Sequence, residues 1–283
     1  MFYLLNRFIQ MKILLNNNDL NEALNNVKNL GFVPTMGSLH KGHISLIKES
    51  LRKTNKTIVS IFINHTQFNN KNDFIKYPKD IKRDLKILSK KKVDYVFIPS
   101  TSEIYKKKIK NFVIYNKDKI LCAKFRKGHF EGVLNIMNRL LSIIKSKYTF
   151  MGEKDFQQIF LLEKYLNKNT NTKFIKCKTI RDNNMIALSS RNFLLTKKNY
   201  KLLALLIKEI FIFIKKIKTQ KNNINNLLIK SKKLELENKF NIWFEYFEIR
   251  DENKLQPSKL TKNSRLFVAY KIDEIRLIDN FKL

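Results

Sequence analysis

The segment Pro34–His43 constrains the fold of this chain more tightly than any other part of the sequence. It follows a short apolar run at 30–33, which predicts a strand, and it precedes residues 44–51, whose apolar spacing predicts a helix. The segment is therefore a strand-to-helix turn. We expect free backbone N–H groups and the positive end of the helix dipole to hold an anion such as phosphate there. His40 and His43 are three residues apart, so one helical turn places both on the same face.

Strands and helices alternate along the N-terminal part of the chain. Apolar runs predict strands at 57–63, 93–99, 148–151 and 174–177. Helical spacing is found at 19–29 and at about 79–91. It is found again in a segment that follows residue 133 and ends near 145, and in a segment that begins after 155, while residues 111–125 have no clear pattern. Such alternation predicts a mostly parallel sheet with helices on both faces. Polar residues at 64–68 directly follow a predicted strand, which is where open α/β sheets bind ligands.

The pattern changes near residue 177. A polar connector at 179–192 ends as a helix cap, and two long amphipathic helices are predicted at about 196–218 and 222–238. Strand-like runs then follow at 244–249, 266–269 and 274–278. We therefore expect two domains, an α/β domain at 1–177 and a smaller α+β domain at 178–283.

The chain carries a large positive charge. It has 57 Lys and Arg against 24 Asp and Glu, which gives a net charge of +33. One interpretation is a nucleic-acid-binding surface. The other is compositional drift, because the lysines are scattered along the whole chain and no stripe of basic and aromatic residues marks a nucleic-acid groove. We favour drift and expect no specific nucleic-acid partner.

Cysteine content and the apolar runs favour a cytoplasmic protein. Hydrophobic residues make up 43% of the chain, which is a globular composition. Cys122 and Cys177 are too few for a disulfide scaffold, and buried thiols in a reducing cytosol are the simplest interpretation. The apolar stretch Met1–Leu5 lacks a cleavage site, and no apolar run approaches the length of a membrane span. We therefore expect neither a signal peptide nor a membrane-spanning segment.

Several short motifs lie along nearly the whole chain. They are Pro34–His43, Ile61–Phe68, Tyr77–Pro78 with Arg83–Leu85, Arg126–Val133, Gly152–Gln158, Ile180–Arg181 with Ala187–Asn192, and Arg276–Asn280. In this order the chain resembles the pantothenate synthetase (pantoate–β-alanine ligase) family. The resemblance implies a Rossmann-like, nucleotidylyltransferase-type parallel sheet domain followed by a smaller α+β C-terminal lid domain, typically in a homodimer. It also implies an AMP-forming ligase that uses ATP and Mg²⁺ to join pantoate to β-alanine through a pantoyl adenylate.

The resemblance also implies the residues of the site. The catalytic residues would be His43, His40, Lys154 and Arg191. ATP would be bound by Met36, Gly37, Ser38, Leu39, His40, Lys41, Gly42, His43, Gly152, Glu153, Lys154, Asp155, Ile180, Leu188, Ser189, Ser190 and Arg191. Pantoate and β-alanine would be bound by Gln67, Gln158, Asn64, Tyr77, Arg126 and His129, and Asp84 is the candidate Mg²⁺ ligand.

Some of these residues also have purely structural interpretations. Asp84 could pair with a neighbouring lysine on a helix face. Ser189 and Ser190 could cap the helix that follows. His129 could be a satisfied structural histidine, and Gln157 and Gln158 could both be surface residues. For the two turn histidines, Lys154 and Arg191, the functional interpretation is the stronger one.

A few positions depart from the family pattern. Lys41 stands where an acidic or small residue is usual, and both His65 and Lys127 replace a proline. Asn184 and Met185 stand where Asp-Gly is common. None of these changes removes a group that the reaction needs, so they bear on stability and rate more than on function.

Two other functions compete with this interpretation. One is another nucleotidylyl or adenylate-forming transferase with the same histidine turn. A tRNA synthetase of this kind would need an anticodon-reading domain, for which the residues after 195 are too few. The second is a basic nucleic-acid-binding protein, which rests on the net charge alone and predicts tight binding with a steep salt dependence.

Overall fold

The structure is a computed structural model that describes residues 11–68, 74–75, 77–105, 111–219 and 224–283. Predictions for Met1–Leu5, and for the first two residues of the helix at 222–238, lie outside the described residues. The chain forms two compact units. The first contains residues up to 113 together with 128–152 and 159–177, and the second contains 114–127, 153–158 and 178–283. The expected division after residue 177 did not anticipate that the two short segments group with the second unit.

The first unit is built on a six-stranded sheet in which every pairing is parallel. The strand order is β1-β4-β3-β2-β5-β6. The strands are β1 (Lys12–Leu14), β2 (Leu30–Thr35), β3 (Lys56–Ile61), β4 (Tyr95–Phe97), β5 (Tyr148–Gly152) and β6 (Lys173–Cys177). From β2 the chain adds β3 and β4 on one side, and later β5 and β6 on the other. The order of the strands therefore reverses between β2 and β5, which is where ligands bind in open α/β sheets.

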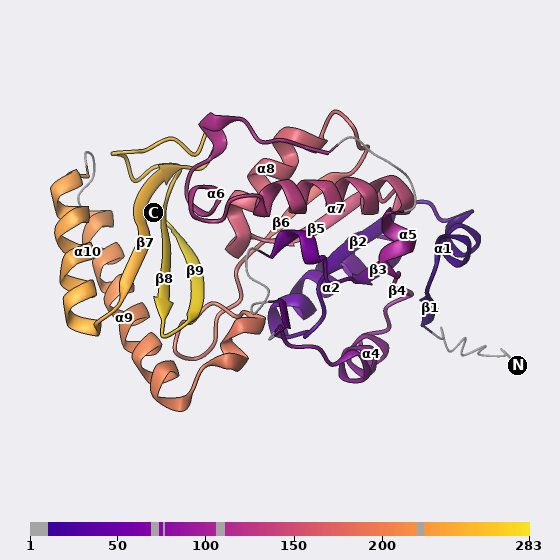
Figure 1. The fold of residues 1–283 in the computed structure, drawn as a ribbon, viewed down its shortest axis with the longest axis horizontal. Helices are drawn as coiled ribbons and strands as arrows, with labels where there is room; N and C mark the ends of the chain where they lie inside the picture. The colour runs from indigo at the N-terminus through magenta and orange to yellow at the C-terminus, as the bar shows by residue number, and fades with distance from the viewer. Residues whose placement is uncertain (1–10, 69–73, 76, 106–110, 220–223) are drawn as a thin grey trace, which may run out of the picture. The chain divides into compact units, whose positions relative to one another are not determined.

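Helices cover both faces of this sheet (Figure 1). The helices of this part are α1 (Asn17–Leu24), α2 (Lys41–Lys53), α4 (Ile81–Lys90), α5 (Thr101–Tyr105), α7 (His129–Ile144) and α8 (Phe156–Leu166). Ile47 of α2 and Leu88 of α4 are fully buried against Val33, Val59 and Val96 of the sheet. In Figure 1, α7 lies on the opposite face from α2 and α4.

The second unit has a three-stranded antiparallel sheet in the order β7-β8-β9. Its strands are β7 (Trp243–Asp251), β8 (Ser264–Ile272) and β9 (Ile275–Lys282), and its helices are α6 (Cys122–Phe125), α9 (Lys197–Thr219) and α10 (Asn226–Phe240). The helices α9 and α10 lie on one face of the sheet (Figure 1). Their buried side chains, such as Ile210 and Leu236, form one core with Phe244 and Val268. The predicted fold class, a parallel α/β domain with a smaller α+β domain, is confirmed.

Two short elements were not predicted from the sequence. The strand β1 has three residues, and α6 has four, which is too few for a periodic pattern to show. The connector at 179–192 leads into a 3₁₀-helix, Ser190–Leu194, and not directly into the long helix that was expected. Among the residues that the structure describes, no helix is long and apolar enough to cross a membrane.

Candidate active site

The turn between β2 and α2 is held from behind by a buried carboxylate. Gly37 and Ser38 both have left-handed backbone conformations, with φ of 79° and 52°. This curl directs the N–H groups of Ser38 and Leu39 at Asp84, which accepts them at 2.7 and 2.8 Å, one on each carboxylate oxygen. Asp84 comes from α4 and is only 1% exposed. A Cβ at Gly37 would lie 3.0 Å from this carboxylate, so glycine suits both the conformation and the space.

These contacts bear on the expected metal role of Asp84. Burial raises the pKa of the Asp84 carboxyl, and the two backbone hydrogen bonds oppose the rise. Both oxygens are engaged with the turn, so the structure favours an anchoring role over the metal-ligand role that we expected. In the described part of the chain, no group of three or more His, Cys, Asp or Glu side chains is arranged to hold a metal ion.

The anchoring role of Asp84 predicts a large loss of stability when the carboxylate is removed. Asp84→Ala leaves two buried N–H groups without an acceptor, at a cost of about 1–3 kcal/mol each. The matched control is Asp80→Ala. Asp80 is the N-cap of the same helix and accepts the backbone N–H of Arg83 at 2.9 Å. Loss of such a cap costs about 1 kcal/mol. Urea unfolding measures both variants, and equal losses would contradict the anchoring role.

The two turn histidines cap the helix that they begin. The backbone N–H of Gly42 donates to His40 Nδ1 at 3.1 Å, and the N–H of His40 donates to His43 Nδ1 at 3.4 Å. The two side chains thus form a reciprocal capping box. Their ring centroids are 4.1 Å apart, so the prediction that they share one face is confirmed.

This cap corrects one expectation from the sequence. We expected free N–H groups at the start of α2, but in the structure the N–H groups of Ser38, Leu39, His40 and Gly42 have acceptors in Asp84, His43 and His40. We therefore expect the histidine side chains, more than these four N–H groups, to meet an anion. Since Nδ1 of each ring accepts a backbone N–H, the neutral ring carries its proton on Nε2. Each histidine then offers an Nε2–H donor, which suits phosphate oxygens.

The loop after β3 is fastened to α7. The Asn64 side chain donates to the carbonyl oxygen of Gly132 at 3.2 Å and accepts from Thr66 and from the Tyr105 hydroxyl, the latter at 2.8 Å. A Cβ at Gly132 would lie 2.6 Å from the Thr66 carbonyl oxygen, so only glycine lets the helix approach this closely. Asn64 is 1% exposed. Its contacts hold the loop in place, which differs from the direct substrate contact that we expected.

The same loop places Gln67 next to the turn. The Gln67 side chain donates to the sulfur of Met36, and its backbone carbonyl receives the Nδ1–H of His129 at 2.6 Å. His129 is 8% exposed and starts α7. Tyr77 is also buried, and its ring packs edge-on against Phe68 with the centroids 5.6 Å apart. The structure therefore brings the predicted substrate residues of the first unit together with the predicted nucleotide turn.

The predicted nucleotide-binding residues at 152–155 follow β5. Gly152 ends that strand, which pairs with β2 and so belongs to the place where the strand order reverses. Glu153–Asp155 form a 3₁₀-turn that belongs to the second unit. The Lys154 side chain is 17% exposed, and its Nζ lies 3.6 Å from Asp155 Oδ1. On α8, Gln157 donates to the carbonyl oxygen of Ile120 at 2.7 Å, whereas Gln158 is half-buried.

The polar connector folds back on itself. Arg181 and Ala187 form an isolated antiparallel bridge, and Leu188 N donates to Ile180 O at 2.9 Å. The Ser189 hydroxyl accepts from Arg191 N at 3.3 Å, so Ser189 is the N-cap of the 3₁₀-helix and not, as the structural interpretation had it, of the long helix. Ser190 is buried. Arg191, Leu188 and Arg126 are partly exposed, and all belong to the second unit.

Sequence reasoning missed the residues that hold the site. Neither Tyr105 nor Gly132 was a predicted site residue, and they contact Asn64 and Thr66. Gly132 stands inside the motif Arg126–Val133, which was a signal of its importance, whereas nothing in the sequence around Tyr105 distinguishes that residue.

Known proteins resemble this chain over almost its whole length. The family model for pantoate–β-alanine ligases matches residues 11–282. The pantothenate synthetase of Azobacteroides pseudotrichonymphae is 40% identical over 263 residues, which cover 89% of this chain and 91% of that protein. The pantothenate synthetase of Flavobacterium psychrophilum is 38% identical over 274 residues, which cover 93% and 95%. The structure of the pantoate–β-alanine ligase of Francisella tularensis, complexed with β,γ-ATP and β-alanine, matches with a TM-score of 0.82 and 33% identity, covering 96% of this chain and 97% of that one.

Proposed function

This chain belongs to the pantoate–β-alanine ligase family, and we propose that it joins pantoate to β-alanine at the expense of ATP. The products are pantothenate, AMP and pyrophosphate, and the intermediate is a pantoyl adenylate. The observation that carries the proposal is the capped pair His40 and His43 at the strand-order reversal, in a chain that the family model matches from residue 11 to 282.

In the first step a pantoate carboxylate oxygen attacks the α-phosphorus of ATP. A new P–O bond forms, the bond to the β-phosphate breaks, and pyrophosphate leaves. Negative charge builds on the phosphate oxygens, so catalysis rests on cations and N–H donors that are already in place. We assign the Nε2–H groups of His40 and His43, and the ammonium of Lys154, to this charge. Ser189, Ser190 and Arg191 are assigned to the β- and γ-phosphates.

In the second step the amine of β-alanine attacks the acyl carbon of the adenylate. The C–N bond forms, the bond to the AMP oxygen breaks, and the nitrogen loses a proton. The Gln67 side chain beside Met36 supports a polar pocket for pantoate next to the nucleotide turn, since an amide can both donate to a carboxylate and accept from a hydroxyl. We assign Gln158, Tyr77, Arg126 and His129 to pantoate and β-alanine as well, and Asn64 to support of the loop.

The remaining expectations are part of the proposal. The carboxylate of Asp84 fits an anchor, so we assign Mg²⁺ to the incoming nucleotide as a Mg²⁺–ATP substrate. Cys122 and Cys177 are both buried and neither forms a disulfide, which supports a reducing, cytoplasmic setting. A homodimer is what the family resemblance implies, and light scattering of the purified protein measures it.

The experiment that tests the function is AMP release from Mg²⁺–ATP and pantoate, with and without β-alanine, followed by mass spectrometry for pantothenate. Pantothenate that forms only when all three substrates are present is the expected result. A folded protein that forms no product would contradict the proposal, and other carboxylates and amines would then be tried. Tight, salt-dependent binding of DNA or RNA in place of turnover would favour the basic-protein alternative.

A further inference from the structure

The motif Arg276–Asn280 has no role in the reaction described above. It forms most of β9, the last strand of the second unit. Its last two residues, Asp279 and Asn280, are each 3% exposed although both are polar. Buried polar side chains are retained only where their hydrogen bonds are satisfied, so their partners indicate what they do.

The side chain of Asn280 forms hydrogen bonds with the backbone of the turn that contains Lys154. Its Nδ2 donates to the carbonyl oxygen of Glu153 at 2.8 Å and to that of Lys154 at 3.0 Å. Its Oδ1 accepts from Arg265 Nη1 at 2.9 Å. An asparagine amide has two N–H donors, and both are used on consecutive peptide units of this one turn. The Asn280 side chain therefore fixes the turn Glu153–Asp155 to β9.

Arg265, which donates to the Asn280 amide, is itself held by several contacts. Its guanidinium lies 4.6 Å from the ring centroid of Phe156 and forms an ion pair with Glu153 at 3.2 Å. The same guanidinium pairs with Glu252 at 2.7 Å. Since Arg265 is held on several sides, it fixes the orientation of the Asn280 amide.

The neighbouring Asp279 holds the polar connector in the same way. Its carboxylate accepts two hydrogen bonds from Arg181, at 2.6 and 2.9 Å. Arg181 also donates to the Asn280 carbonyl oxygen at 3.2 Å. Burial raises the pKa of Asp279, and the Arg181 guanidinium opposes the rise. Arg181 follows Ile180, so the two adjacent residues Asp279 and Asn280 hold both segments of this unit that are assigned to ATP.

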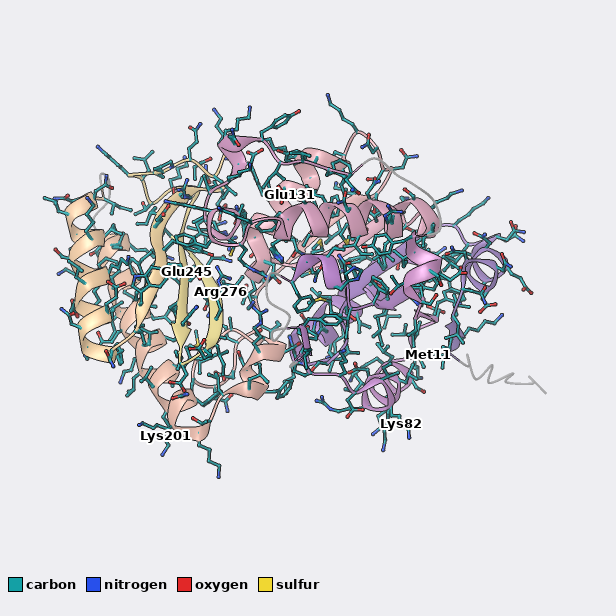
Figure 2. The ribbon with its side chains drawn as sticks, viewed as in Figure 1. Met11, Lys82, Glu131, Lys201, Glu245 and Arg276 are labelled. Atoms are coloured by element: carbon teal, nitrogen blue, oxygen red, sulfur yellow. The ribbon has the colours of Figure 1, made fainter. Side chains whose placement is uncertain are left out.

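We propose that Asn280 is a positioning residue for the adenylation step and acts through Lys154. The inference rests on the proposed function, because it needs Lys154 to stabilise the charge on the α-phosphate. A displacement of about 1 Å at such a cation is enough to lower a rate about 100-fold. Arg276, at the other end of the motif, lies beside Glu245 (Figure 2) and pairs with it at 2.6 Å.

A double-mutant cycle on AMP formation tests the proposal. Asn280→Ala is expected to lower kcat about 10- to 100-fold with less than about a threefold change in the KM for ATP. In a Lys154→Ala background, assayed at high enzyme concentration, the same change is expected to cost less than about twofold. The matched control is Asn199→Ala, which removes another buried asparagine of this unit whose amide donates to Asp273. Its kcat is expected to stay within about twofold of the wild type.

The outcomes separate the two proposals. A wild-type protein that forms no pantothenate contradicts the proposed function. The positioning role is overturned if the wild type is active and Asn280→Ala lowers kcat by the same factor with and without Lys154. An equal loss of kcat in Asn199→Ala also overturns it. Where Asn280→Ala does not fold, Asn280→Asp decides, because it keeps the acceptor for Arg265 and lacks both donors to the turn.

Discussion

Replacing Lys154 by alanine is expected to lower kcat for pantoate-dependent AMP formation by at least about 100-fold, because a positioned charge is lost from a transition state that accumulates negative charge. Two features of the structure support this assignment. The backbone of Lys154 is held by Asn280, and its side chain is 17% exposed, so the ammonium is partly withdrawn from water while its anchor is fixed. A cation of this kind stabilises negative charge in the transition state more than a freely moving surface lysine does.

The measurement is steady-state kinetics with each substrate varied in turn, together with thermal unfolding. The matched control is Lys176→Ala, since Lys176 is a half-exposed lysine that pairs with Glu163 at 2.9 Å. We expect that variant to stay within about twofold of the wild-type kcat, because a surface ion pair contributes only about 0–1 kcal/mol. A Lys154→Ala protein with near-wild-type turnover would refute the assigned role.

Replacing His43 is expected to have an effect of similar size. The neutral ring carries its proton on Nε2, because Nδ1 accepts the N–H of His40. His43→Ala removes both functions, the cap on α2 and the donor on Nε2. His43→Asn separates them, because the amide oxygen reaches about as far as Nδ1 while nothing replaces Nε2.

We therefore expect His43→Ala and His43→Asn to lose at least about 100-fold in kcat, and only His43→Ala to lose about 1 kcal/mol of stability from the cap. Urea unfolding and kinetics on the same preparations measure both quantities. The control is His65→Ala, because this histidine is exposed and carries no assigned role. A His43→Asn protein that keeps its turnover would show that the ring serves only as a cap.

Much of the fold follows from the order of apolar segments. The strands that became β2, β3, β5 and β6 were predicted within about two residues, and so were both long helices of the second unit at their C-terminal ends. These elements are long enough for their periodicity to exceed the background. The strand β1 was missed because three residues carry no period, and the short helix at Cys122–Phe125 was missed for the same reason.

The residues of the site were predicted more completely than their contacts. Asp84 was expected near the nucleotide because it stands in a motif, but its partners are two N–H groups that are more than forty positions away in the sequence. Asn64 was expected to meet substrate, and it proves to be enclosed by Thr66, Tyr105 and Gly132. No local pattern encodes such contacts, because they depend on which segments the sheet order brings together.

The sequence by itself determined the class of the two domains, the family and the chemical types of the groups available for catalysis, because these depend on local patterns and residue identity. Only the tertiary structure decided which groups are occupied and which residues hold others in place. The N–H groups of Ser38, Leu39, His40 and Gly42 are bound by Asp84 and the histidines, and the backbone of Lys154 is bound by Asn280 from the last strand of the chain. The physical reason is that hydrogen bonds depend on distance and direction in space, and sequence separation places no limit on either.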